Sequence, residues 1–185
     1  MIIGLTGTFA SGKDTVADYL EHKKGFEHYA TGDVIRELAT KQGIEPTRDN
    51  LRELGNKLRD EHGLAFLPRT IMEKKAKTNK VIVSGLRQPD EITYLRSLGD
   101  FFLIAVDAPI ELRFKRMQSR HRPGDPKDID EMREKERKEM DSSAGNSQCI
   151  KDCMEAANFA VVNDGGVADL YHKIDQIYDA IRNKK

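Results

Sequence analysis

Apolar and polar positions along the chain alternate between two periodicities. Five short apolar runs, rich in β-branched residues and bounded by turn residues, are typical of buried strands. Between them lie longer segments whose apolar positions recur three or four residues apart, as on one face of a helix. This alternation predicts an α/β fold, with a doubly wound, five-stranded parallel sheet covered by helices on both faces. The expected strands cover residues 2–6, 25–30, 80–85, 101–107 and 159–162.

Capping and breaking residues indicate where the helices begin and end. Thr31 is a candidate cap for a helix over 33–41, and Thr47 for a helix that ends at Gly63. Residues 64–77 should continue helically, with a kink or restart at Pro68. The other expected helices start at Lys13, Pro89 and Pro109, cover 128–140 and 167–182, and include a short one with both cysteines after a loop at 142–147.

Length and charge limit the classes of partner. The chain has 185 residues, which fits a single domain over 1–185 with a core of its own. Lysines plus arginines equal aspartates plus glutamates in number, at 31 each, so no net field attracts nucleic acid or an anionic membrane. No stretch approaches the ~20 apolar residues of a membrane span. We therefore expect neither nucleic acid nor a membrane as a partner.

Two features favour a cytoplasmic protein. The first strand begins at the N-terminus, which leaves no room for a signal peptide. Cys149 and Cys153 lie one helical turn apart, where a disulfide is geometrically unfavourable. Without further cysteines or a close histidine pair they also make a poor zinc site. We therefore expect two reduced thiols.

The segment Gly7-Thr8-Phe9-Ala10-Ser11-Gly12-Lys13-Asp14-Thr15 follows the first strand directly and opens the first helix. In this context the glycine spacing and the lysine predict a phosphate-binding loop. The glycines let backbone N–H groups point into one concavity, and the helix N-terminus adds its positive dipole end. The lysine ammonium would bind the β- and γ-phosphates of ATP. The residues expected to bind ATP are Gly7, Phe9, Ala10, Ser11, Gly12, Lys13, Asp14 and Thr15.

One position departs from the usual pattern of such loops. Asp14 takes the place of the serine or threonine that normally ligates Mg²⁺, and Thr15 follows it. Both carry oxygen donors, which hard cations prefer, so both are candidate Mg²⁺ ligands. Alternatively, Asp14 only caps the first helix, and Thr15 or water completes the metal shell.

The second and third strands end in segments suited to a second anion. Thr31-Gly32-Asp33-Val34-Ile35-Arg36 supplies a hydroxyl, a helix N-terminus and an arginine one turn later. Ligands of parallel sheets bind beyond the carboxyl ends of the strands, so this segment and Ser84–Arg87 should face the phosphate loop across one cleft. Asn163–Gly166 should reach the same cleft, near the base of the donor or as a plain turn. Alternatively, Thr31 and Asp33 only cap the helix, with a surface ion pair to Arg36.

These motifs resemble those of the P-loop nucleoside and deoxynucleoside monophosphate kinases, the adenylate-kinase-like family. Thr-Gly-Asp-x-x-Arg looks like their monophosphate-binding segment, which implies an acceptor site within residues 31–78. Ser84-Gly85-Leu86-Arg87-Gln88-Pro89-Asp90-Glu91 is similar to the x-x-Arg-x-Pro-x-Glu segment of phage-type deoxynucleotide kinases and of archaeal proteins related to dephospho-CoA kinase. Ser84 departs from the family, where many relatives have an acidic residue near Mg²⁺. The acceptor-binding residues implied are Thr31, Asp33, Arg36 and Arg87.

A basic segment follows the fourth strand. Cations that arrive from a mobile segment can stabilise the transferring phosphoryl group and exclude water. The resemblance implies a lid over about 116–140, with Arg116, Arg120 and Arg122 as catalytic phosphate contacts besides Lys13. Arg113 and Lys115 are expected to be solvated charges on a helix face. The alternating charges of 127–139 are expected to form an exposed, salt-bridged helix without a site.

The function expected from these motifs is an ATP- and Mg²⁺-dependent phosphotransferase, monomeric or homodimeric. Its small-molecule acceptor would be a (deoxy)nucleoside monophosphate. One alternative is a kinase similar to dephospho-CoA kinase, in which Asp33 would be the base for a ribose hydroxyl. A further alternative is a nucleotide-dependent regulatory P-loop NTPase, which would not need a second arginine-lined pocket.

Overall fold

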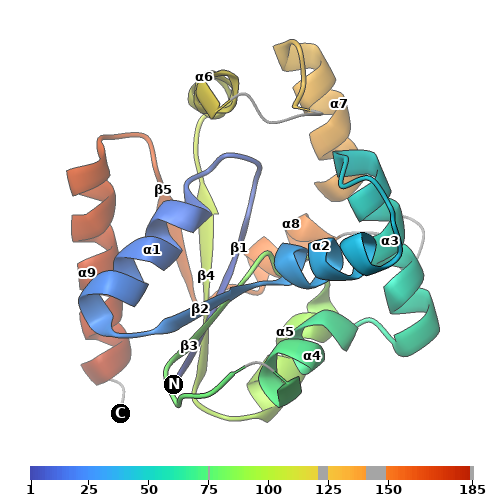
Figure 1. Cartoon of the computed structure of the whole chain (residues 1–185). Helices are drawn as coiled ribbons and strands as arrows, with labels where there is room; N and C mark the ends of the chain where they lie inside the picture. The colour runs from blue at the N-terminus through green and yellow to red at the C-terminus, as the bar shows by residue number, and fades with distance from the viewer. Residues whose placement is uncertain (75, 121–124, 141–148, 184–185) are drawn as a thin grey trace.

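Five parallel strands form the centre of the molecule. The computed structural model describes residues 1–74, 76–120, 125–140 and 149–183, apart from the side chain of Lys138. In the described chain the strand order is β2-β3-β1-β4-β5, as Figure 1 shows. The first strand along the chain is therefore central, and the second and fifth form the two edges. The strands are β1 (Ile2–Gly7), β2 (Glu27–Ala30), β3 (Val81–Ser84), β4 (Phe101–Asp107) and β5 (Phe159–Val162).

Helices cover both faces of this sheet (Figure 1). One face packs against α1 (Lys13–Lys24) and α9 (Val167–Asn183). The other packs against α4 (Phe66–Lys74), α5 (Pro89–Ser97) and α8 (Ile150–Glu155), with α2 (Thr31–Lys41) and α3 (Arg48–His62) beside them. The end of β4 leads into α6 (Ile110–Arg120), which is followed by α7 (Ile129–Met140).

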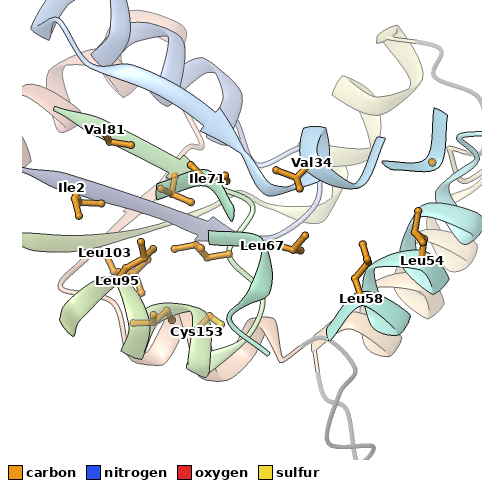
Figure 2. Packing of buried hydrophobic residues seen from close by; sticks show 14 residues of the cluster. Ile2, Val34, Leu54, Leu58, Leu67, Ile71, Val81, Leu95, Leu103 and Cys153 are labelled. Carbon is orange, nitrogen blue, oxygen red and sulfur yellow. The ribbon is translucent and has the colours of Figure 1, made fainter. Parts of the chain in front are cut away.

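Alternate side chains of each central strand point to opposite faces and join two separate cores. Ile2 of β1 belongs to the core beneath α4, α5 and α8, whereas its neighbour Ile3 belongs to the core beneath α1 and α9. Figure 2 shows Ile2 together with Val81 and Leu103 from the flanking strands. Because both faces are buried, the central strands are continuously apolar rather than alternating, which explains why they were predictable from sequence.

The predicted fold class and its five strands are confirmed, with differences at some helix ends. Thr31 is not a cap: α2 begins at Thr31, whose Oγ1 donates a hydrogen bond to the carbonyl of Gly85 at 2.8 Å. The predicted helix over 64–77 is too long, because α4 ends at Lys74 and holds Pro68 in its first turn. In the first turn of a helix the backbone N–H groups have no intrahelical partner, so the N–H that proline lacks costs no hydrogen bond. Thr47 caps α3 as expected, with Oγ1 accepting from the N–H of Asn50 at 3.3 Å.

Both cysteines are free thiols, as expected; Cys153 lies within α8, and Cys149 immediately precedes that helix. The predicted loop at 142–147 lies outside the described residues. None of the helices in the described chain is long and apolar enough to cross a membrane.

A buried ion pair fixes the segment that follows β3. Arg59 of α3 donates to Glu91 of α5 at 3.0 Å, and the two side chains are 1% and 0% exposed. The second carboxylate oxygen of Glu91 accepts from the backbone N–H groups of Arg87 and Gln88, at 2.7 and 3.2 Å. The pair therefore connects α3 to the backbone that carries Arg87.

Removal of one partner from this pair should destabilise the fold more than removal of both. Arg59→Met leaves the Glu91 carboxylate buried without its cation, at a cost of about 3–5 kcal/mol. Arg59→Met combined with Glu91→Gln should recover much of this loss, because the uncompensated charge is then gone. Urea unfolding measures both free energies. A single variant as stable as the wild type would show that the pair does not constrain the fold.

Candidate active site

A cavity of about 560 Å³ opens at the carboxyl ends of β1, β2 and β3. The phosphate loop forms one side of it, and α2, α3 and the end of β3 form the other. Among the described residues that line it, the acidic ones are Asp14 and Glu139. Its lining cations are Lys13, Arg36, Arg48, Arg52, Arg59, Arg87, Arg116 and Arg120. This charge balance fits an anionic ligand.

At two positions of the phosphate loop, the backbone conformation and the close neighbours leave room only for glycine. Gly7 and Gly12 have φ angles of +132° and +101°. A Cβ on Gly7 would lie 1.9 Å from the carbonyl oxygen of Val106, and one on Gly12 would lie 2.3 Å from Asn163 Nδ2. The sequence prediction of a tightly curled loop therefore has a direct steric basis.

Neighbouring strands hold this loop from outside. Thr8 Oγ1 donates to Asp107 Oδ1 at 2.6 Å, at the end of β4. Asn163 Nδ2, after β5, donates to the carbonyl of Ser11 at 2.8 Å. The predicted segment 163–166 thus supports the loop through Asn163, and its residues do not line the cavity.

Lys13 lies with its ammonium inside the loop. Nζ donates to the carbonyls of Gly7 and Thr8, at 3.0 and 2.6 Å, and lies 3.4 Å from Ser11 Oγ. Desolvation by burial, together with the nearby Arg87, lowers the pKa of Lys13 from 10.5 to about 8. An anion bound at this position would offset both effects, which is what a phosphate-binding lysine requires.

The predicted acceptor residues come together only in part. Thr31, Arg36 and Arg87 line the cavity, but Asp33 lies instead in a separate hollow of about 360 Å³. Asp33 Oδ1 accepts from Arg36 Nη2 at 2.6 Å, with both side chains more than half exposed. This is the surface ion pair that the alternative interpretation expected.

Sequence reasoning missed Arg48 and Glu139, which line the cavity on the side where the acceptor is predicted to bind. Arg48 lies with its guanidinium carbon 3.7 Å from the ring centre of Phe9, and it donates to Glu139 Oε1 at 3.2 Å. Arg87 donates to the second oxygen of the same carboxylate. Glu139 is 4% exposed, and it lines the cavity.

The expectation of an exposed helix without a site over 127–139 is therefore wrong. Met132, Glu136 and Glu139 lie on one face of α7, at spacings of four and three, and this face packs against the protein. Met132 belongs to a small core with Phe9 and Met117. That spacing was visible in the sequence, but the many charges concealed it.

Arg113 is likewise not a solvated charge. It is 5% exposed, its Nε donates to the carbonyl of Ala108 at 2.6 Å, and its Nη2 donates to Glu136 at 3.0 Å. It connects α6 to α7. Lys115 is exposed, as expected.

Two of the three predicted lid arginines line the cavity. Arg116 Nη2 donates to the carbonyl and to Oδ1 of Asn163, at 3.1 and 3.3 Å. Its Nη1 is buried and has no hydrogen-bond partner among the described residues. Arg120 pairs with Asp125 at 3.1 Å. Arg122 lies outside the described residues.

The donor set at the start of α1 fits a hard cation. Asp14 and Thr15 line the cavity with a carboxylate and a hydroxyl, the oxygen ligands that Mg²⁺ prefers. No cluster of three or more histidine, cysteine or acidic side chains that could hold a metal occurs in the described part of the chain. Phosphate oxygens and water would therefore have to complete the shell. Ser84 is the position at which many members of the kinase family that the sequence resembles have an acidic residue, and here its Oγ lies 2.7 Å from His28 Nε2.

Comparisons with known proteins identify relatives over most of the chain. A family model described as "AAA domain" matches residues 3–140. A UPF0200 protein of Hyperthermus butylicus is 35% identical over 156 residues, which are 83% of each chain. A UPF0200 protein of Pyrococcus abyssi is 33% identical over 96% of this chain and 95% of that one. A UPF0200/UPF0201 protein of Archaeoglobus fulgidus is 34% identical, and this chain spans 54% of its length.

Solved structures show the same fold. A shikimate kinase from Aquifex aeolicus matches with a TM-score of 0.57, 16% identity and 97% of each chain covered. A gluconokinase from Sinorhizobium meliloti matches with a TM-score of 0.58 and 16% identity, over 99% of this chain and 96% of that one. At these identities the similarity concerns the fold.

The lowered pKa of Lys13 predicts a specific pH dependence of stability. Below about pH 8 the buried ammonium is charged and destabilises the folded chain. Between about pH 8 and 10.5 the folded chain has lost this proton while the unfolded chain retains it, so stability rises with pH. Relative to Lys13→Met, the free energy of unfolding of the wild type should rise by up to about 3 kcal/mol across this interval.

Urea unfolding at a series of pH values measures this difference. The exposed Lys115→Met controls for the loss of one positive charge and should follow the wild type. A constant difference between wild type and Lys13→Met would contradict the buried ammonium.

Proposed function

The chain belongs to the UPF0200 family and to the AAA domain family, and we propose that it is an ATP-dependent phosphotransferase. The observation that carries the proposal is the composition of one cavity. A phosphate-binding loop with Lys13 and a second group of arginines, among them Arg36, Arg48 and Arg87, line it together. A protein that only binds or hydrolyses a nucleotide needs the first of these groups but not the second.

Phosphoryl transfer needs little covalent chemistry from the protein, so positioning and charge carry the catalysis. Lys13 and the loop would hold the phosphates of ATP, and Arg116 and Arg120 would stabilise charge on the transferring group. Asp14 and Thr15 would hold Mg²⁺, which would supply positive charge at the phosphates of ATP. Arg36 and Arg87 would hold the acceptor.

We propose a (deoxy)nucleoside monophosphate as the acceptor. The arginines of the acceptor side suit a phosphate group. Ile35, Leu51 and Gly55 of α2 and α3 line the same cavity and offer an apolar wall for a base. A volume of about 560 Å³ lies within the usual range of small-molecule sites. The acceptor site would occupy residues 31–78 and the lid residues 116–140, within one domain.

The structure gives less support to an acceptor hydroxyl of the dephospho-CoA type. Such a reaction would use a carboxylate base, and Asp33 was the candidate. Asp33 lines a different hollow and pairs with Arg36, so it does not face the phosphate loop.

An acceptor screen tests the proposed function. Purified protein with ATP and Mg²⁺ is incubated with each nucleoside and deoxynucleoside monophosphate and with dephospho-CoA, and ADP formation is measured. At least one monophosphate should stimulate ADP formation, and Lys13→Ala should lower this rate about 10²–10³-fold. Turnover that no acceptor stimulates would refute the proposal and favour the regulatory NTPase.

Arg87→Ala should raise the KM for the acceptor far more than the KM for ATP, because a guanidinium that grips the acceptor phosphate does not contact the donor. Arg36→Ala should have the same direction but a smaller effect, since Arg36 is about half exposed and already pairs with Asp33. Steady-state kinetics with each substrate varied separates the two constants. An equal rise in both would argue against separate donor and acceptor sites.

Asp14→Asn should raise the Mg²⁺ concentration needed for half-maximal rate, with partial recovery at high Mg²⁺, because a hard cation loses a charged ligand. Asp14→Ser should perform better than Asp14→Asn, since it restores the hydroxyl usual at this position. Mg²⁺ titrations of the initial rate distinguish the variants. An unchanged Mg²⁺ requirement in Asp14→Asn would show that Asp14 is only a helix cap.

A further inference from the structure

Glu139 occupies a position that an anionic substrate group would be expected to take. Its carboxylate is almost fully buried at the acceptor side of the cavity, 4% exposed as a residue. Arg48 binds one of its oxygens at 3.2 Å, and Arg87 binds the other. Two guanidinium groups that converge on the two oxygens of one anion form a strong oxyanion receptor.

Contacts that do not involve Glu139 hold the guanidinium of Arg48 and the backbone of Arg87. Arg48 stacks on Phe9 at 3.7 Å and follows directly after the helix cap at Thr47. The backbone N–H of Arg87 donates to Glu91 at 2.7 Å, and its carbonyl accepts from the N–H of Cys149 at 2.7 Å. The receptor should therefore keep its place when another anion replaces the carboxylate.

Charge decides which anion can replace it. A phosphate monoester carries about two negative charges and three acceptor oxygens near neutral pH, whereas a carboxylate carries one charge and two oxygens. A competing carboxylate gains nothing over Glu139, which is already tethered at the site. A phosphate group gains one additional charge against Arg48, Arg87 and the nearby Lys13.

We propose that Glu139 is a specificity-determining residue that fills the Arg48–Arg87 receptor and admits only acceptors with a dianionic phosphate group. The proposal rests on the proposed function, because it assumes that the acceptor enters this cavity. It narrows the substrate class: acceptors whose anionic group is a carboxylate are excluded although the cavity is rich in cations.

The rest of α7 allows this to be tested by substitution. Met132 packs with Phe9 and Met117, and Glu136 pairs with Arg113 at 3.0 Å. These contacts anchor the helix independently of Glu139. Glu131, on the same helix, pairs with Lys135 at 3.0 Å and offers a matched control for the loss of one negative charge.

The test measures binding without ATP, so it does not depend on phosphoryl transfer. Inorganic phosphate and acetate are titrated at constant ionic strength into wild type, Glu139→Gln and Glu131→Gln, and dissociation constants are measured by calorimetry. Glu139→Gln should bind phosphate at least about tenfold more tightly than wild type, since a charge-assisted competitor is gone. It should also gain binding of acetate. Glu131→Gln should behave as the wild type.

Arg87→Ala in the Glu139→Gln background should abolish the gain, which would locate the anion at the receptor. Unchanged or weaker phosphate binding in Glu139→Gln would overturn the proposal, because Glu139 would then only orient the arginines. If Glu139→Gln is too unstable for calorimetry, the rise of its unfolding temperature on addition of phosphate provides the readout. Phosphate should then stabilise this variant more than the wild type, and an equal effect on both would overturn the proposal.

The outcomes also separate this proposal from the proposed function. Tighter phosphate binding by Glu139→Gln, together with an acceptor screen in which nothing reacts, would support the receptor and refute the kinase. A reactive monophosphate together with unchanged phosphate binding would support the kinase and refute the role of Glu139.

Discussion

Like charges gathered in a small space repel one another, and much of the architecture at the carboxyl end of the sheet can be understood as control of that repulsion. Lys13 and seven arginines line one cavity of about 560 Å³. Glu139 lies between two of these arginines, Glu91 holds a third, and Asp125 pairs with a fourth. Burial is the main cause of the lowered pKa of Lys13, and repulsion by the nearby Arg87 adds to it. An anionic ligand would relieve the repulsion among these cations, and this relief would strengthen the binding of phosphate.

Two acidic residues of one helix hold cations from three other parts of the chain. Glu139 and Glu136 lie on α7, whereas their partners lie on α3, after β3 and on α6. The same face of α7 also contributes Met132 to a core with Phe9 of the phosphate loop. One helix thus connects the loop that would bind ATP with the arginines that would bind the acceptor. Both halves of the site therefore depend on where α7 packs.

The fold and the phosphate loop were predictable because their signals are local. Strands buried on both faces appear as continuous apolar runs, and the loop is a nine-residue motif between a strand and a helix. Several of the errors concern side chains whose partners lie far away in sequence. Thr31 binds Gly85 rather than its own helix, and Arg48 meets Glu139 across 91 residues. No sequence signal assigned a role to His28, which lies within hydrogen-bond distance of Ser84. The charged residues of α7 concealed its packed face, because a glutamate that pairs with two arginines can be as deeply buried as an apolar residue.

The central claim is that one cavity holds a donor and an acceptor together. A dinucleoside pentaphosphate, in which five phosphates join two nucleosides, tests it directly because it spans both halves at once. Calorimetry should show one molecule bound per chain, about 10²-fold more tightly than ATP or a nucleoside monophosphate alone. Arg87→Ala should remove most of this gain but leave ATP binding in place. A pentaphosphate ligand that binds no more tightly than ATP, or no more tightly than inorganic pentaphosphate, would contradict a two-substrate site.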